Sequence, residues 1–209
     1  DGNNIYGLCL NNSNNEEGYL YKIDTDTDVM SYVGSLLAAG WAIEHPHGQM
    51  VYNSSTNTIY GTKDRFSSIS SYGGGLWSFN LTTSTVASLW GIFQNDINIL
   101  GSNATGVVQA NNGKMYVTTQ NGGANGKGTI IQCESSGSGQ IKVYDFPSNF
   151  GTVSGTGMIA SGSKIFGTCT YDVSGPQLWS YDYINSTFDI IFSGDQTDPL
   201  KPGWNVDWG

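Results

Sequence analysis

A tandem repeat constrains this chain more than any other feature of its sequence. A short motif, an apolar residue followed by an aromatic one, recurs at intervals of roughly 50 residues. Its four copies are Ile5-Tyr6-Gly7, Ile59-Tyr60-Gly61, Met115-Tyr116-Val117 and Ile165-Phe166-Gly167. Repeats of about 40 to 50 residues, when built from short β-strands, are typical of propeller blades.

The second repeat shows what one unit contains. Between residues 48 and 90, four short runs rich in β-branched and aromatic residues are separated by clusters of Gly, Asn, Ser and Thr. Such runs predict four antiparallel strands joined by turns. The repeat therefore predicts an all-β fold, a four-bladed β-propeller with four antiparallel strands per blade.

The two chain ends complete each other in this scheme. The first repeat begins at its second strand, because only residues 1–4 precede Ile5, whereas Gly203 to Trp208 match the first strand of a repeat. We expect this C-terminal strand to join the N-terminal blade, which closes the ring and removes an exposed sheet edge. A single propeller domain then spans residues 1–209, with blades at 203–209 plus 1–34, 48–93, 106–146 and 157–193.

Charge and composition narrow the partners. The net charge of −9 disfavours nucleic acid and anionic membranes, both of which attract clustered Lys and Arg. No apolar run reaches the roughly 18 residues of a membrane span, and a helical pattern is confined to residues 35–39. We expect no membrane insertion and no cofactor, and partners that are neutral glycans or further copies of the chain.

Asn-x-Ser/Thr sequences suggest glycosylation and secretion. Each of the five copies falls where we expect a turn or loop, although such triplets also arise by chance in Asn-rich and Thr-rich sequence. The acceptor residues are Asn11, Asn53, Asn80, Asn103 and Asn185.

The possible metal and thiol sites have simpler explanations. The Asp24-to-Asp28 segment resembles the start of a calcium loop but lacks its later Gly and Glu, so we expect turn capping there. His45 and His47 have no third ligand at a typical spacing, which argues against zinc. We expect the three cysteines to be buried apolar residues, with one disulfide as the alternative: Cys9, Cys133 and Cys169.

The third repeat resembles the GloVer-type tandem repeat, a Leu-Tyr-Gly-Thr-Thr strand followed by a Gly-Gly-rich loop and a Gly-Thr-Val-Phe strand. The resemblance covers residues 114–131, where Val117 replaces the Gly of the pattern. The second repeat keeps Tyr60-Gly61-Thr62 and Gly73-Gly74-Gly75, and the first and fourth keep less. The resemblance implies a secreted or surface-exposed propeller and brings no catalytic residues with it.

We expect ligand binding on the face that carries the longer connections between strands, because long loops on a rigid scaffold commonly carry function. Aromatic rings there can stack on the C–H faces of sugars, and amides and carboxylates can bond their hydroxyls. The residues we select are Trp41, His45, His47, Tyr72, Asn121, Asn125, Tyr171, Asp172 and Trp204.

Three functions follow from the sequence. The first is a secreted, non-catalytic, lectin-like carbohydrate-binding propeller. The second is a structural glycoprotein module of an extracellular surface layer or filament. A glycan-active enzyme is third, because no acid and base are brought together by any motif.

Overall fold

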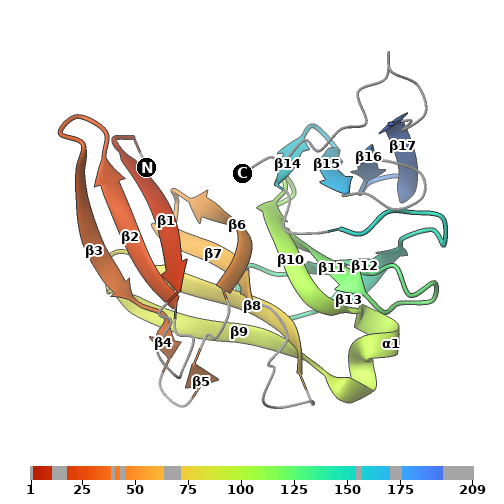
Figure 1. Ribbon diagram of the computed structural model, residues 1–209, viewed down its shortest axis with the longest axis horizontal. Helices are drawn as coiled ribbons and strands as arrows, with labels where there is room; N and C mark the ends of the chain where they lie inside the picture. Colours follow the sequence, from red (N-terminus) through yellow and green to blue (C-terminus); the bar gives the residue numbers. More distant parts are fainter. Residues whose placement is uncertain are drawn as a thin grey trace.

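The structure is a computed structural model that describes residues 2–10, 18–38, 41–42, 46–63, 72–153, 157–169 and 176–194. At positions 10, 37, 38, 41, 42, 47, 72 and 94 it describes the backbone alone. Four antiparallel sheets follow one another along the chain and around an arc (Figure 1). The predicted all-β fold built from antiparallel strands is confirmed.

Three of these sheets contain four strands in sequence order. Sheet 2 comprises β6 (Pro46–Asn53), β7 (Thr58–Lys63), β8 (Tyr72–Asn80) and β9 (Thr85–Phe93). Sheet 3 comprises β10 (Ser102–Gln109), β11 (Met115–Asn121), β12 (Thr129–Cys133) and β13 (Ile141–Asp145). Sheet 4 comprises β14 (Met158–Ser161), β15 (Lys164–Cys169), β16 (Gln177–Asp182) and β17 (Thr187–Ser193).

Sheet 1 has three strands within the described residues: β1 (Asn4–Leu10), β2 (Gly18–Asp24) and β3 (Val29–Ser35). Since β1 corresponds to the second strand of the other sheets, sheet 1 shows no counterpart of their first strand. The predicted C-terminal partner, 203–209, lies outside the described residues. Closure of the ring by that segment therefore stays a prediction.

Helical structure lies elsewhere than the sequence suggests. A 3-10 turn, η1 (Gln94–Asp96), runs into a short helix, α1 (Ile97–Leu100), between β9 and β10. Residues 35–39, where we expected a helical pattern, contain β4 (Leu37–Ala38), which pairs with β5 (Trp41–Ala42) in a small hairpin. Five residues are too few for periodicity to distinguish helix from strand, and pairing with a neighbouring strand decided the outcome.

The sheets pack face against face, and the recurring residues of the repeat form the core between them. We call the face of each sheet that packs against the preceding sheet its rear face and the opposite face its front face. In sheet 1 the rear face is the one that carries the equivalent repeat positions, such as Ile5 and Tyr21. Trp77 and Trp179 occupy the same position on the rear faces of sheets 2 and 4, and both are fully buried. Each indole lies over a glycine of the neighbouring strand, Gly61 or Gly167. The recurring aromatic residues thus hold the sheets together, as the repeat predicts.

The inner strands of the arc approach one another closely. The side-chain amide oxygen of Gln49 in β6 accepts a hydrogen bond from the backbone N–H of Met158 in β14, past the intervening β10. Gln49 is next to Gly48, where an added Cβ would lie 1.9 Å from the carbonyl oxygen of Thr105 in β10. A glutamine side chain reaches only a few ångströms, so the first strands of sheets 2 and 4 lie close together at this end.

The turns explain why the strands stop where they do. A carboxylate or amide oxygen at the end of a strand accepts hydrogen bonds from backbone N–H groups two and three residues later, at Asp24, Asn53, Asn80 and Asp182. The turn then ends in a left-handed residue, at Asp28, Asn57, Ser84 and Ser186. Asn and Asp tolerate this conformation, and their side chains make these bonds readily. Turn capping at Asp24 is therefore confirmed.

These caps predict a contribution to stability that depends on pH. The backbone N–H groups of Asp26 and Thr27 lower the pKa of Asp24 below its usual 3.8. The side-chain amide of Asn185, and then the backbone N–H groups of the same turn, lower the pKa of Asp182. A carboxylate with a lowered pKa stabilises the fold above its unfolded-state pKa, and this stabilisation is lost as the pH falls through the folded-state value.

We therefore expect the double variant Asp24→Asn, Asp182→Asn to be less stable than the wild type near pH 7, because it lacks the ionised carboxylates, and to lose less stability below about pH 3. Asparagine already makes the same cap at Asn53 and Asn80, so the turns keep their geometry. Urea unfolding midpoints at both pH values measure the effect. Equal acid losses in wild type and double variant would show that these carboxylates do not cause the acid sensitivity.

The cysteines follow the prediction in two cases out of three. Cys133 and Cys169 are buried in the core, and burial raises the pKa of Cys133 to about 11. Cys9 is exposed, contrary to expectation. No disulfide joins any two of them. Cys9 is exposed because it lies on the rear face of sheet 1, on which no sheet of the described residues packs.

Candidate functional site: the open face of sheet 1

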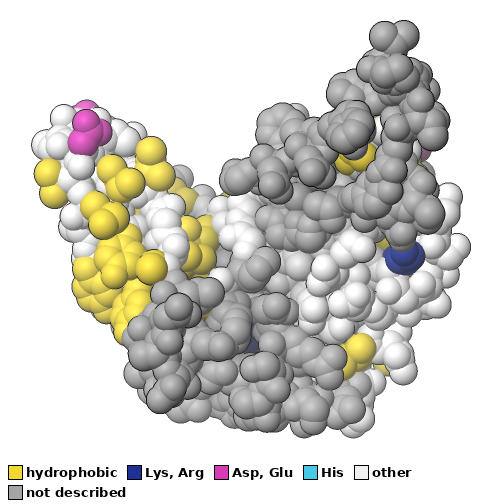
Figure 2. Space-filling view, in the orientation of Figure 1, with side chains coloured by type: hydrophobic (Ala, Val, Ile, Leu, Met, Phe, Trp, Pro, Cys, Tyr) yellow, Lys and Arg dark blue, Asp and Glu magenta, His cyan; other side chains and the backbone are white. Residues whose placement is uncertain are grey.

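The rear face of sheet 1 is apolar and open. Three cross-strand rows contribute to it: Ile5, Ile23 and Met30 in one, Gly7, Tyr21 and Tyr32 in the next, then Cys9, Tyr19 and Ser35. Figure 2 shows hydrophobic side chains gathered over this sheet. We call this surface the open face.

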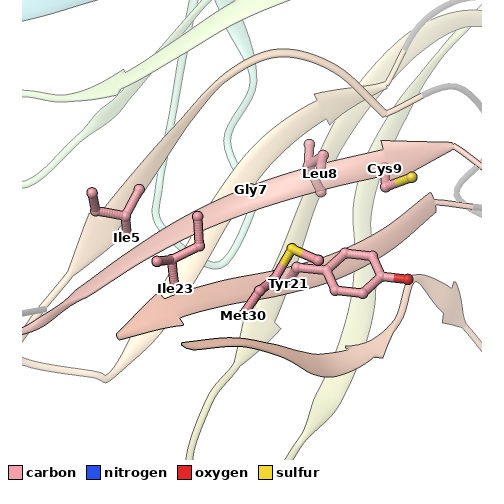
Figure 3. Close-up of a pocket in the computed structure, with 7 residues that line it drawn as sticks. All are labelled: Ile5, Gly7, Leu8, Cys9, Tyr21, Ile23 and Met30. Atoms are coloured by element: carbon pink, nitrogen blue, oxygen red, sulfur yellow. The ribbon is translucent and has the colours of Figure 1, made fainter. Parts of the chain in front are cut away.

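A shallow hollow of about 220 Å³ lies on the open face. Its lining comes from all three strands: Ile5, Gly7, Leu8 and Cys9 from β1, Tyr21 and Ile23 from β2, and Met30 from β3 (Figure 3). Tyr21 and Tyr32 pack edge to face, with ring centroids 5.8 Å apart. Hydrocarbon, thioether and aromatic groups dominate the hollow, so it favours an apolar partner surface over a charged substrate.

Ile5 and Tyr21 of the open face are at least partly exposed, whereas the equivalent residues in the other three sheets are buried. Ile5 is 61% exposed, whereas its equivalents Ile59, Met115 and Ile165 are 0 to 1% exposed. Tyr21 likewise corresponds to Trp77, Ile131 and Trp179, which are all fully buried. In sheets 2, 3 and 4 these positions pack against the front face of the preceding sheet. The open face thus has the residue types of a sheet-packing surface, and no sheet of the described residues packs on it.

A second apolar surface lies at the other end of the arc. The front face of sheet 4 carries Ile159 and Phe166 in one cross-strand row and Leu178 and Phe192 in the next. Ile159 is 63% and Phe192 45% exposed. Their counterparts on the front face of sheet 2, among them Tyr60 and Leu76, are buried against sheet 3. We call this surface the end face.

The predicted ligand-binding residues are only partly described. The backbone places Trp41 in β5, His47 in β6 and Tyr72 at the start of β8. Asn121 ends β11, and Asn125 lies in the loop that follows. Four predicted residues lie outside the described part of the chain: His45, Tyr171, Asp172 and Trp204.

The loop that carries Asn125 is well anchored. The side-chain amide of Asn125 donates to the carbonyl oxygen of Phe146 at 2.9 Å, and the backbone N–H of Ala124 donates to the carboxylate of Asp145 at 2.8 Å. Positive φ angles at Gly122 and Gly123 allow this close approach, which explains the paired glycines of the third repeat. The amide N–H that we expected to face a ligand is thus engaged in holding the loop, while Asn121 and Asn125 remain exposed.

The glycosylation candidates are divided among turns and strands. Asn185 is exposed in a turn, while Asn53 and Asn80 end β6 and β8. The prediction that Asn103 lies in a loop is wrong, because it lies within β10 beside a bulge and adopts a positive φ. Asn with a left-handed backbone is common in turns, so the sequence predicts a turn at this position. Here Asn103 lies in a strand, next to the bulge between Ala104 and Gly106. Asn11 lies outside the described residues.

Among the described residues, no three His, Cys, Asp or Glu side chains lie close enough together to hold a metal ion. Within the same residues, no helix has the length and hydropathy to cross a membrane.

Comparisons with known proteins agree on the fold. No family model matches the sequence, and no curated protein matches it. Among solved structures, TolB from Acinetobacter baumannii is similar with a TM-score of 0.62 at 12% identity, over 93% of this chain and 42% of TolB. A chain of a nidogen/laminin complex gives 0.58 at 11% identity, over 91% of this chain and 62% of that chain. The β-propeller domain of the Trilobed protease from Pyrococcus furiosus, described as having an open velcro topology, gives 0.54 at 8% identity, over 92% and 55%.

These likenesses, together with the four radially ordered sheets, define the chain as a β-propeller fold. This chain spans 42 to 62% of the length of the three structures it matches. At such low identity the similarity concerns the fold alone.

Proposed function

We propose that this protein is a non-catalytic structural module of an extracellular assembly, which associates through its apolar sheet faces. The proposal rests on one observation. Ile5 is 61% exposed, whereas the equivalent residues Ile59, Met115 and Ile165 are buried in sheets 2, 3 and 4. Monomeric proteins rarely leave a contiguous apolar surface of this kind uncovered, because covering it releases water at a gain of about 25 cal/mol per Å².

A non-catalytic role is supported by the structural contacts of four of the described carboxylates. Asp24 and Asp182 cap turns, Asp145 anchors a loop, and Glu134 pairs with Lys114. The buried thiol of Cys133 has its pKa raised to about 11, which keeps it protonated and weakly nucleophilic. Each of these groups has a structural task and none lines the open face.

Secretion and glycosylation are part of the proposal. Among the described acceptors Asn185 is the exposed one, and its amide nitrogen donates to Asp182 at 3.0 Å. Asn53 is more constrained, because its amide nitrogen donates to Gln109 at 2.8 Å, while the hydroxyl of Ser55 donates to its oxygen at 2.6 Å. We also propose that the four sheets are the blades of one propeller around a common centre, which the close approach of Gln49 to Met158 supports. Association through the open face requires this ring to stay open between sheets 4 and 1, so it is the alternative to closure by residues 203–209.

Carbohydrate binding is a second proposal, supported by the anchored loop that exposes Asn121 and Asn125. A rigid loop loses little conformational entropy when it binds a sugar. Screening the purified protein against arrayed neutral glycans tests it. Retention that disappears in an Asn121→Ala, Asn125→Ala variant with native circular dichroism supports binding there, and absence of retention contradicts it.

The assembly proposal predicts that the wild-type protein is larger than one chain in solution. We expect light scattering at micromolar concentrations to give a mass above 22.4 kDa and the variant Ile5→Glu to reduce it to that value. Ile99→Glu in α1 is the matched control, since Ile99 is similarly exposed but lies away from the open face. A wild-type protein that stays at 22.4 kDa at all concentrations would contradict the proposal.

A further inference from the structure

We infer that the open face of one copy receives the end face of a second copy, so that chains associate head to tail. This inference rests on the proposed function and names the partner and the two surfaces. It concerns two surfaces at opposite ends of the arc in Figure 1.

The internal interfaces act as the template for this contact. Between sheets 1 and 2, Leu20 of a front face packs with Ile59 and Trp77 of a rear face. Between sheets 3 and 4, Tyr116 and Ile130 of a front face pack with rear-face residues such as Ile165. Each interface therefore joins the same two sets of repeat positions, front face to rear face.

The end face presents the same front-face positions that pack against a rear face in the internal interfaces. Phe166 corresponds to Tyr60 and Tyr116, and Leu178 corresponds to Leu76 and Ile130, all of which are front-face residues. A contact between the end face and the open face continues the established series of interfaces by one further step. Among the described sheets, no other front face is uncovered, so the partner surface belongs to sheet 4.

The two surfaces belong to the first and the last sheet of the arc, at opposite ends of the described chain (Figure 1). The end face of a second copy can therefore pack on the open face. Because the two surfaces differ, the contact is heterologous, and repeated contacts either close into a ring or continue as a filament. The net charge of −9 opposes association, so an apolar contact should strengthen as salt screens the repulsion.

Two single variants test the pairing. Met30→Glu places a charge on the open face, and Ile159→Lys places one on the end face, both at exposed positions where the fold tolerates a polar side chain. In a head-to-tail assembly each variant alone stays monomeric, because every contact needs both surfaces. An equimolar mixture regains a single contact and gives a particle of twice 22.4 kDa. The control Ile99→Lys assembles as the wild type does.

The outcomes separate this inference from the function on which it rests. If Ile159→Lys alone still associates while Met30→Glu does not, the open face binds something other than the end face, and only the head-to-tail pairing fails. If the wild type is monomeric throughout, both proposals fail. Circular dichroism and thermal unfolding establish that both variants are folded.

Cys9 provides a readout without mutation. It is exposed on the open face, whereas Cys133 and Cys169 are buried in every state of the folded chain. We expect alkylation of Cys9 to slow at least tenfold as the protein concentration rises into the associating range, while the two buried thiols stay unmodified. A Cys9 rate independent of concentration, in a sample that light scattering shows to be associated, would overturn the assignment of the open face.

Discussion

A valine in place of Gly61 is expected to destabilise the protein by about 3 kcal/mol, the upper end of the usual cost of overpacking a core. The first added atom, Cβ, would lie 2.2 Å from a carbon of the Trp77 indole. Trp77 is fully buried, and its indole N–H donates to the carbonyl oxygen of Thr62 at 2.9 Å, so the ring is fixed and has no room to withdraw. Urea unfolding measures the loss.

The chain contains both the rescue and the control for this variant. In sheet 3 the equivalent pair is Val117 opposite Ile131, so Gly61→Val combined with Trp77→Ile reproduces a pair that the fold already accepts. We expect the double variant to recover most of the loss. Gly7→Val occupies the same strand position in sheet 1, where no atom lies within 4 Å, and should change stability by less than about 0.5 kcal/mol. A double variant no more stable than Gly61→Val would show that the indole is not the obstacle.

Gly48→Ala is expected to be the second severe change, with a cost of more than about 3 kcal/mol from strain and collision together. Gly48 has a φ of +81°, and its added Cβ would lie 1.9 Å from the Thr105 carbonyl oxygen. That oxygen belongs to the backbone of β10, so relief requires β6 and β10 to separate. The separation would also displace Gln49 from the backbone of Met158.

Gly113→Ala separates the two causes. Gly113 has nearly the same φ, +78°, but no atom within 4 Å of its added Cβ. It should therefore show only the conformational cost of roughly 1 to 2 kcal/mol. If the two alanine variants unfold at the same urea concentration, the close approach of β6 and β10 contributes nothing to the stability of the protein.

The sequence predicted the sheets well because their signals are local and repeated. The apolar-aromatic motif of strands β1, β7, β11 and β15, together with the Asn and Asp turns, specifies strand order and register without reference to distant residues. The exceptions are positions where a neighbour decides. Asn103 lies beside a bulge in β10, and Leu37 and Ala38 pair in a hairpin, because contacts absent from the local pattern determine both.

The candidate site was much less predictable. Ile5, Tyr21 and Met30 have the same residue types as core positions elsewhere in the repeat, so the sequence marks them as interior. Their exposure depends on the absence of a preceding sheet within the described structure, which no local pattern encodes. Conversely, Asn125 reads as a surface amide available for binding, but the Phe146 carbonyl that engages it is remote in sequence.

Two facing positions on neighbouring strands hold glycine and tryptophan in sheets 2 and 4, and valine and isoleucine in sheet 3. These pairs restrict how such repeats can diverge after duplication. Either pair fills the space between two sheets, but a valine opposite tryptophan collides and a glycine opposite isoleucine leaves a void. Descendants of a common blade can therefore exchange one pair for the other only through a costly intermediate. Among relatives of this chain, these two positions should covary more strongly than their separate frequencies predict.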